Sequence, residues 1–207
     1  MSCKRVLRRA CPIGLIAALA ASAPAMASPN SSCALLNKTL VKKVFGLKYF
    51  ETAPGFNGVA DGATKQECDG IVTAINPSTK KERTFIKTHG QKLTAAGKVA
   101  TLHVETWETI GDPGDPFDPD KVLTDFETAS DGFFINYLHG TSFAVPKFGA
   151  SVGVGYQGPK GGVREASAMW RTTGGSVIQL TIVQKRSLPI ESRLKKLAAN
   201  TVSAFTS

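Results

Sequence analysis

Two cysteines offer the most specific chemistry in this sequence, Cys33 in "SPNSSCALLNKTLVKKVFG" and Cys68 in "KQECDG". A cysteine can close a disulfide, carry a lipid, attack a substrate or bind a metal. A lipid-attachment signal would place a Leu-like residue three positions before Cys33, where Asn30 stands. An even pair of cysteines in an exported chain most often forms a disulfide. The sequence therefore predicts a Cys33–Cys68 disulfide, with lipidation of Cys33 and a catalytic thiol as the alternatives.

A run of aspartates spaced by prolines, "GDPGDPFDPD", is a second candidate site. Asp112, Asp115, Asp118 and Asp120 lie within it, and several oxygens on one loop could hold a hard cation such as calcium. The run lacks the central glycine and the closing glutamate of the twelve-residue calcium loop. It is therefore interpreted as a solvated loop in which Asp118 caps a helix, and calcium binding at Asp112–Asp120 is the alternative.

The remaining titratable residues do not form a recognisable reactive set. The three histidines, His89, His103 and His139, do not have the i, i+4 spacing of a helical metal pair. Glu105 and Glu108 are three apart in a strand pattern, so they point to opposite faces and cannot flank one glycosidic bond. The sequence thus predicts no catalytic residues, no cofactor and no metal ligands.

Two tryptophans, Trp107 in "ETWET" and Trp170 in "AMWRT", lie in strand patterns with polar neighbours. Exposed tryptophans there could form a stacking surface for a sugar or a peptide. Packing in the core or at a sheet edge is the commoner role of such residues, and it is the one expected here.

The N-terminus indicates export. Four basic residues precede an apolar, alanine-rich run, and Ala25-Met26-Ala27 has the form of a signal-peptidase site. Residues 1–27 are therefore interpreted as a cleaved signal peptide, and residues 28–207 as a single domain, with no transmembrane helix left after signal removal. The four basic residues account for the fall in formal charge from +9 to +5 on cleavage. The remaining positive charge is scattered, which argues against a nucleic-acid partner.

The first half of the domain mixes clear and weak patterns. An apolar stripe from Leu35 to Val44, followed by Gly46, predicts a helix. Residues Glu51–Lys65 are rich in Gly, Ala and Pro and are expected to form a loop. Strands are predicted at Cys68–Ile75 and Val99–Ile110, with a further short strand at Arg83–His89.

The second half is patterned more regularly. Asp118 and Pro119 have the residue types of a helix N-cap and first turn. Three strands separated by Gly-rich turns follow, and Pro189 opens a closing helix with an apolar stripe. The expected fold class is α+β, with an antiparallel sheet of about five to six strands, helices packed on one side, and one disulfide.

Several of these segments together resemble a known group of proteins. The segments "CALLNKTLVKKVFG", "ATKQEC", "FAVPKFGASV" and "LKKLAANTVSAF" are similar to those of small secreted actinobacterial-type envelope proteins with a cysteine-bracketed domain of unknown function. That domain is similar in outline to the extracellular sensor domains of bacterial serine/threonine kinases. The resemblance implies a non-enzymatic envelope domain and supplies no catalytic residues.

The sequence therefore favours a secreted, non-enzymatic binding or accessory domain of the bacterial cell envelope. Its expected partner is an envelope ligand, which is a peptide, a glycan or a lipid headgroup. The alternative is a secreted hydrolase whose site is assembled from residues distant in sequence.

Overall fold

The computed structural model describes residues 31–60, 62–110, 117–148, 152–158, 163–185 and 188–206. The predicted signal peptide, and Asp112 and Asp115 of the aspartate run, lie outside these ranges. The described strands form one antiparallel sheet in the order β1-β2-β3-β7-β6-β5-β4. Their bounds are β1 Tyr49–Ala60, β2 Ala63–Thr73, β3 Val99–Thr109, β4 Thr141–Phe143, β5 Val152–Gln157, β6 Val163–Arg171 and β7 Val177–Lys185. The α+β class is confirmed, and the sheet has seven strands rather than five or six.

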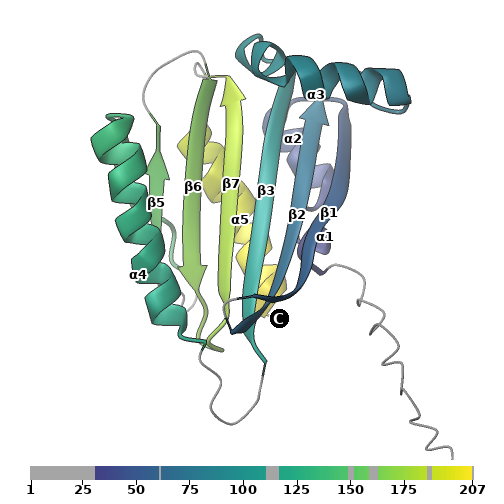
Figure 1. Ribbon diagram of the computed structural model, residues 1–207. Coiled ribbons are helices and arrows are strands. Elements are labelled where there is room, and N and C mark those ends of the chain that lie inside the picture. Colours follow the sequence, from purple (N-terminus) through teal and green to yellow (C-terminus); the bar gives the residue numbers. More distant parts are fainter. Residues whose placement is uncertain are drawn as a thin grey trace, which may run out of the picture.

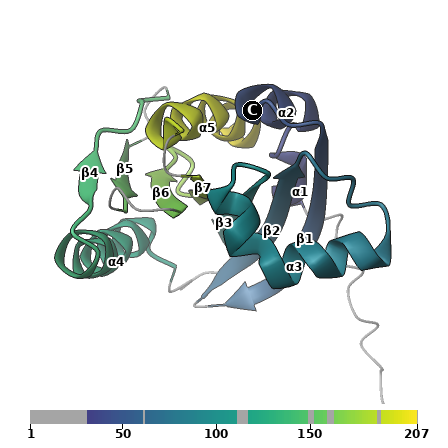
Figure 2. The same ribbon diagram turned by 90° about the horizontal axis from the view of Figure 1, so that it is seen from above.

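Helices cover both faces of this sheet (Figures 1 and 2). One face carries α1 (Ser31–Ala34), α2 (Lys38–Phe45) and α5 (Ile190–Thr206). The other carries α3 (Lys80–Ala95) and α4 (Pro119–Ser130), which continues as a π-helical segment, η1 (Asp131–Tyr137). The expectation that the helices lie on one side therefore needs correction, because α3 and α4 pack on the second face.

The main core lies between the sheet and α1, α2 and α5. Alternate residues of the central strands, such as Leu102, Leu180 and Trp170, point to this face and are almost completely buried. Leu194 and Val202 of α5 pack against them. The closing helix begins at Ile190, directly after Pro189, as its sequence predicts.

The second face is covered only in part. Ile86 and Leu93 of α3 pack on Val99 at one end of the sheet. Leu123 of α4 packs on Trp107 and its neighbours at the other end. The two apolar clusters do not join, so the side chains in the middle of this face belong to neither of them.

The disulfide joins the first helical turn to the sheet. Cys33 of α1 is bonded to Cys68 of β2, and their Cα atoms are 5.1 Å apart. Cys68 is fully buried in the main core. The predicted pairing is confirmed, and neither cysteine holds a free thiol.

The segment Glu51–Lys65 is not a loop. It forms most of β1 and the start of β2, which pair antiparallel from Tyr49↔Thr73 to Ala60↔Ala63. Because β1 is an edge strand, it tolerates Pro54 and a bulge between Pro54 and Asn57. The chain reverses at Gly62, whose φ is +76°, and the Asp-Gly dipeptide there is a hairpin signal.

The segment Arg83–His89 is helical rather than extended. It lies inside α3, which begins with a capping box: the Thr79 hydroxyl accepts from the Glu82 amide, and the Glu82 carboxylate accepts from the Thr79 amide. This box satisfies amide groups at the start of the helix. It outweighs the strand preference of the residues that follow.

Other predicted boundaries agree with the structure. Gly46 ends α2 in the left-handed conformation, with φ +67°. A new N-cap at Asn37 divides the first predicted helix into α1 and α2. Asp118 caps α4 with Pro119 in its first turn. Among the helices of the described ranges, none is long and apolar enough to cross a membrane.

Candidate functional site

A row of polar side chains crosses the middle of the second face, between the two apolar clusters. Strand register places Asp69 of β2 beside His103 of β3, and His103 beside Thr181 of β7. The row continues to Ser167 of β6 and Tyr156 of β5. Paired residues in an antiparallel sheet share a face, so five strands contribute one side chain each. We call these five residues the polar row.

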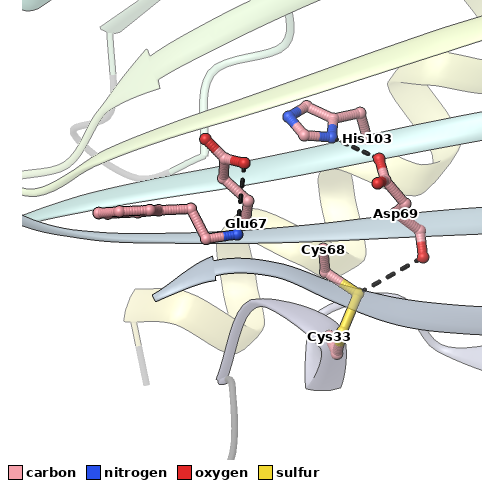
Figure 3. Close-up of a disulfide and its surroundings, with 6 residues drawn as sticks. Cys33, Glu67, Cys68, Asp69 and His103 are labelled. Atoms are coloured by element: carbon pink, nitrogen blue, oxygen red, sulfur yellow. Dashed lines mark hydrogen bonds and ion pairs between the residues drawn. A yellow bond between two sulfur atoms is a disulfide. The ribbon is translucent and has the colours of Figure 1, made fainter. Parts of the chain in front are cut away.

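The polar row is on the opposite side of β2 from the disulfide. Figure 3 shows Cys68 directed toward Cys33 of α1, whereas its neighbours Glu67 and Asp69 extend to the other side. This separation follows from the two-residue period of a strand. The same strand therefore anchors the main core with one set of residues and presents charge with the other.

His103 is held between two carboxylates. Its Nδ1 is 2.7 Å from Oδ1 of Asp69, and its Nε2 is 2.7 Å from Oε1 of Glu105. The hydrogen bond with Glu105, joined by that with Asp69, outweighs burial and raises the pKa of His103 to about 9. The imidazole is therefore protonated at neutral pH and donates from both nitrogens.

Lys65 closes this network on its other side. Its Nζ is 2.8 Å from Oε1 of Glu67 and 3.0 Å from Oε2 of Glu105. Partial burial opposes its charge, but these two carboxylates raise the pKa of Lys65. Burial likewise opposes the charge on Glu105, whereas His103 and Lys65 hold its pKa below the usual value. Lys65 also lies 5.2 Å from the centre of the Trp107 ring.

One group in this network has the composition of a metal site. Ligand atoms of Glu67, His103 and Glu105 all lie within 4.8 Å of one another. Lys65 and protonated His103 already supply positive charge to these carboxylates. A metal ion would have to displace a proton and an ammonium group, so the geometry favours a self-compensated ion-pair network.

The other half of the polar row is neutral. It is also covered, because Ser167 and Tyr156 are buried and Tyr156 packs on Phe126 of α4 and Phe134 of η1. The hydroxyls of Ser167 and Thr181 are 2.8 Å apart, and Nε2 of Gln179 donates to both oxygens. Beyond them, the Tyr156 hydroxyl bonds to Asp131, and burial followed by this contact raises the pKa of Tyr156 to about 12. Ser167 lies two strands from His103, a separation of about 10 Å. The histidine is thus too far away to activate this serine.

Cavities flank the polar row on both sides. A cavity of about 510 Å³ lies beneath α3, and Asp69 of the row lines its edge. A second cavity, of about 660 Å³, lies beside α4 and is lined by Lys65, Trp107 and Gln179 together with residues of the helix. We call the polar row and these two cavities the groove.

The residues singled out in the sequence have different places in the structure. Trp170 is completely buried and Trp107 is 8% exposed, so the expectation of packing roles is confirmed. Of the aspartate run, Asp118 caps α4 and Asp120 pairs with Arg171 at 3.0 Å. His89 stacks on Phe85 within α3.

Sequence reasoning missed the partners of His103. Alternation in the predicted strand Val99–Ile110 puts His103 and Glu105 on one face, but Lys65 was assigned to a loop, and Glu67 and Asp69 were not considered. Their alternation in "KQECD" is a strand signal. An earlier start for β2 would have placed all three on one face.

No model of a known protein family matches the chain, and no curated protein sequence matches it significantly. The function therefore has to be inferred from the groove itself.

Proposed function

We propose that this protein is a secreted, non-enzymatic binding domain of the bacterial cell envelope and that the groove on the second sheet face holds its ligand. The observation that carries the proposal is the polar row lying between two cavities, with Asp69 and His103 at its partly exposed end. Concave sites with a few placed polar groups are typical of ligand binding. Its ligand is a peptide, a glycan or a lipid headgroup.

The chemistry of the groove supports binding more than hydrolysis. A general base must be unprotonated at the working pH, whereas the carboxylates of Asp69 and Glu105 raise the pKa of His103 to about 9. The Ser167 hydroxyl bonds to Thr181 and Gln179, and both cysteines are held in the disulfide. No observation in the described ranges favours the hydrolase alternative.

Export is supported by the N-terminal sequence and by the disulfide. Disulfides persist in oxidising compartments, and Cys33–Cys68 is buried at one end in the core. We expect the exported protein to begin at Ser28. Mass spectrometry should find this N-terminus without added lipid mass, and an acylated Cys33 would contradict the disulfide and identify a lipoprotein.

The binding proposal is tested with a variant that obstructs the groove. Thr181→Phe places a ring in the middle of the polar row, and Ala199→Trp places one at an exposed position of α5, the helix on the opposite face of the sheet (Figure 2). Immobilised exported proteins are exposed to envelope extract, and retained compounds are identified by mass spectrometry and tested again in pure form. The wild type and Ala199→Trp should bind the same compound, and Thr181→Phe should bind it at least about tenfold more weakly. Equal binding by all three proteins would refute the groove as the site.

A further inference from the structure

We propose that the cavity beneath α3 binds a single-chain anionic amphiphile, with its hydrocarbon chain against the sheet and its charged head at Arg83 and Lys87. The inference rests on the proposed binding function and names the ligand class for one part of the groove. It depends on three features of the cavity: its apolar lining, the two cations Arg83 and Lys87, and the helix α3 that covers it.

The lining of the cavity is predominantly hydrocarbon. Ile71, Val99 and Val183 of three adjacent strands form its floor, and Ile86 of α3 faces them. Its volume of about 510 Å³ lies within the range of sites that enclose small molecules, about 300–1,000 Å³. Removing an alkyl chain from water into such a lining strengthens binding by about fourfold for each buried methylene group.

Cations lie at one side of this apolar space. Arg83 and Lys87 are one helical turn apart on α3, and both line the cavity. Neither side chain makes an ion pair within the described ranges. Two cations at i and i+4 repel each other, so an anionic head between them would relieve the repulsion and gain charge-assisted hydrogen bonds.

Acidic residues on the opposite side define the orientation of the ligand. Asp69 lines the cavity but is already paired with His103 at 2.7 Å. Glu51 lies on the edge strand β1. A negative head is therefore repelled from the β1 side and attracted to the α3 side. A cationic amphiphile would meet the reverse arrangement, with Arg83 and Lys87 opposing it.

The cover of the cavity is held by few contacts. The buried residues of α3 are Ile86, Leu93 and Thr94. Of the three apolar clusters in the described ranges, the one beneath this helix has the fewest buried residues. Figure 1 shows α3 lying across the end of the sheet, with its length roughly perpendicular to the strands. Such an element can move away from the sheet at low cost, which gives a long chain access to the cavity.

The test compares soluble amphiphiles with hydrocarbon chains of nearly equal length. Dodecanoate, 1-lauroylglycerol and dodecyltrimethylammonium, each below its micelle concentration, are titrated into the exported protein in a calorimeter. Dodecanoate should bind at one site per protein molecule, at least about tenfold more tightly than the uncharged or the cationic compound. Octanoate should bind far more weakly than dodecanoate, since it buries four fewer methylene groups.

Variants assign the binding to this cavity. Arg83→Ala/Lys87→Ala should weaken dodecanoate binding about tenfold or more and leave 1-lauroylglycerol binding nearly unchanged. Lys81→Ala/Lys92→Ala removes two cations of the same helix that do not line the cavity, and it should bind as the wild type does. Val183→Phe fills the floor of the cavity and should abolish dodecanoate binding. If this variant does not fold, the comparison of octanoate with dodecanoate on the wild type still tests whether the hydrocarbon chain is buried.

The inference is overturned by absence of saturable dodecanoate binding, by equal affinity for the three head groups, or by equal loss in both double-alanine variants. Binding only to anionic vesicles, and not to dispersed dodecanoate, would also overturn it. If amphiphiles fail while an envelope compound still binds in a manner blocked by Thr181→Phe, the inference is wrong and the proposed function stands. If both tests fail, the groove does not bind a ligand.

Discussion

His103 is the centre of the charged network on the second face. It bonds to Asp69 and Glu105, while Lys65 bonds to Glu105 and Glu67. With His103 protonated, two cations face three carboxylates on a partly buried surface. Each charge in the network therefore has an opposite charge within hydrogen-bond distance, which lowers the cost of removing it from water.

We expect the contribution of His103 to stability to fall as the pH rises. Its pKa is about 9 in the folded protein and about 6.5 in an unfolded chain, so folding favours the protonated form. The contribution is complete below about pH 6.5 and is lost as the pH rises through about 9. Urea unfolding of the wild type and His103→Gln should therefore give a difference in the free energy of unfolding that shrinks by about 1–2 kcal/mol between these pH values, after allowance for solvent screening. A constant difference would contradict the two hydrogen bonds to carboxylates.

Replacing Trp170 by alanine should mainly destabilise the fold. The ring is completely buried and lies beside Phe148, and its Nε1 donates to the Pro146 carbonyl at 3.4 Å. Removing a buried tryptophan typically costs about 3–5 kcal/mol of unfolding free energy, which urea unfolding measures. Trp107→Ala should destabilise as well. A variant that keeps its melting temperature but loses ligand binding would instead place that tryptophan in the recognition surface.

The sequence allowed part of the site to be predicted residue by residue. Alternation in "TLHVETW" places His103, Glu105 and Trp107 on one face without any structure. The contacts from β2 to His103 and Glu105 depend on which residues face each other across two strands. Such register is fixed by the pairing of the whole sheet, and one strand alone does not contain that information.

At the scale of elements, α3 begins with a capping box and has few buried residues. Thr79→Ala removes the capping box and should cost about 1 kcal/mol, and this loss should be confined to α3. Hydrogen exchange followed by mass spectrometry should show faster exchange in Lys80–Ala95 and unchanged exchange in α5.

The matched control is Thr84→Ala in the same helix. The Thr84 hydroxyl donates only to the Lys80 carbonyl one turn earlier, a contact that contributes little to helix stability. This variant should exchange no faster than the wild type, because alanine has a higher helix propensity than threonine. Faster exchange throughout the protein in Thr79→Ala would show that α3 unfolds together with the sheet.

Elements were predicted well where local pattern and tertiary environment agree. Strand β7 alternates clearly because one face lies in the main core and the other faces the groove, whereas β6 is buried on both faces from Ala166 to Trp170. The edge strand β1 has an exposed, proline-containing sequence, since it packs against neighbours on one side only. The segment Arg83–His89 has β-branched and aromatic residues, yet the cap at Thr79 determines its conformation.

At the scale of the whole molecule, the two faces of the sheet have different tasks. The face beneath α1, α2 and α5 buries a continuous apolar core. The other face has two small apolar clusters with the polar row between them. The first face can supply most of the stability, so the second can retain charged groups and cavities that contribute little to it. We propose that this division is what leaves one face available for a ligand.

Reduction of the disulfide tests how much it contributes to holding α1 on the first face of the sheet. It fixes α1 on β2, and β2 is itself paired with β1 and β3 along its length. Reduction should therefore lower the free energy of unfolding by about 2–4 kcal/mol while the sheet remains. Urea unfolding with and without reductant gives the first quantity, and the far-ultraviolet circular dichroism spectrum should change little. A Cys33→Ala/Cys68→Ala variant should match the reduced wild type and should not respond to reductant, because the sheet around β2 keeps its own hydrogen bonds. Loss of the strand signal on reduction would show that the sheet depends on the bond, and unchanged stability would show that α1 is held by its packing alone.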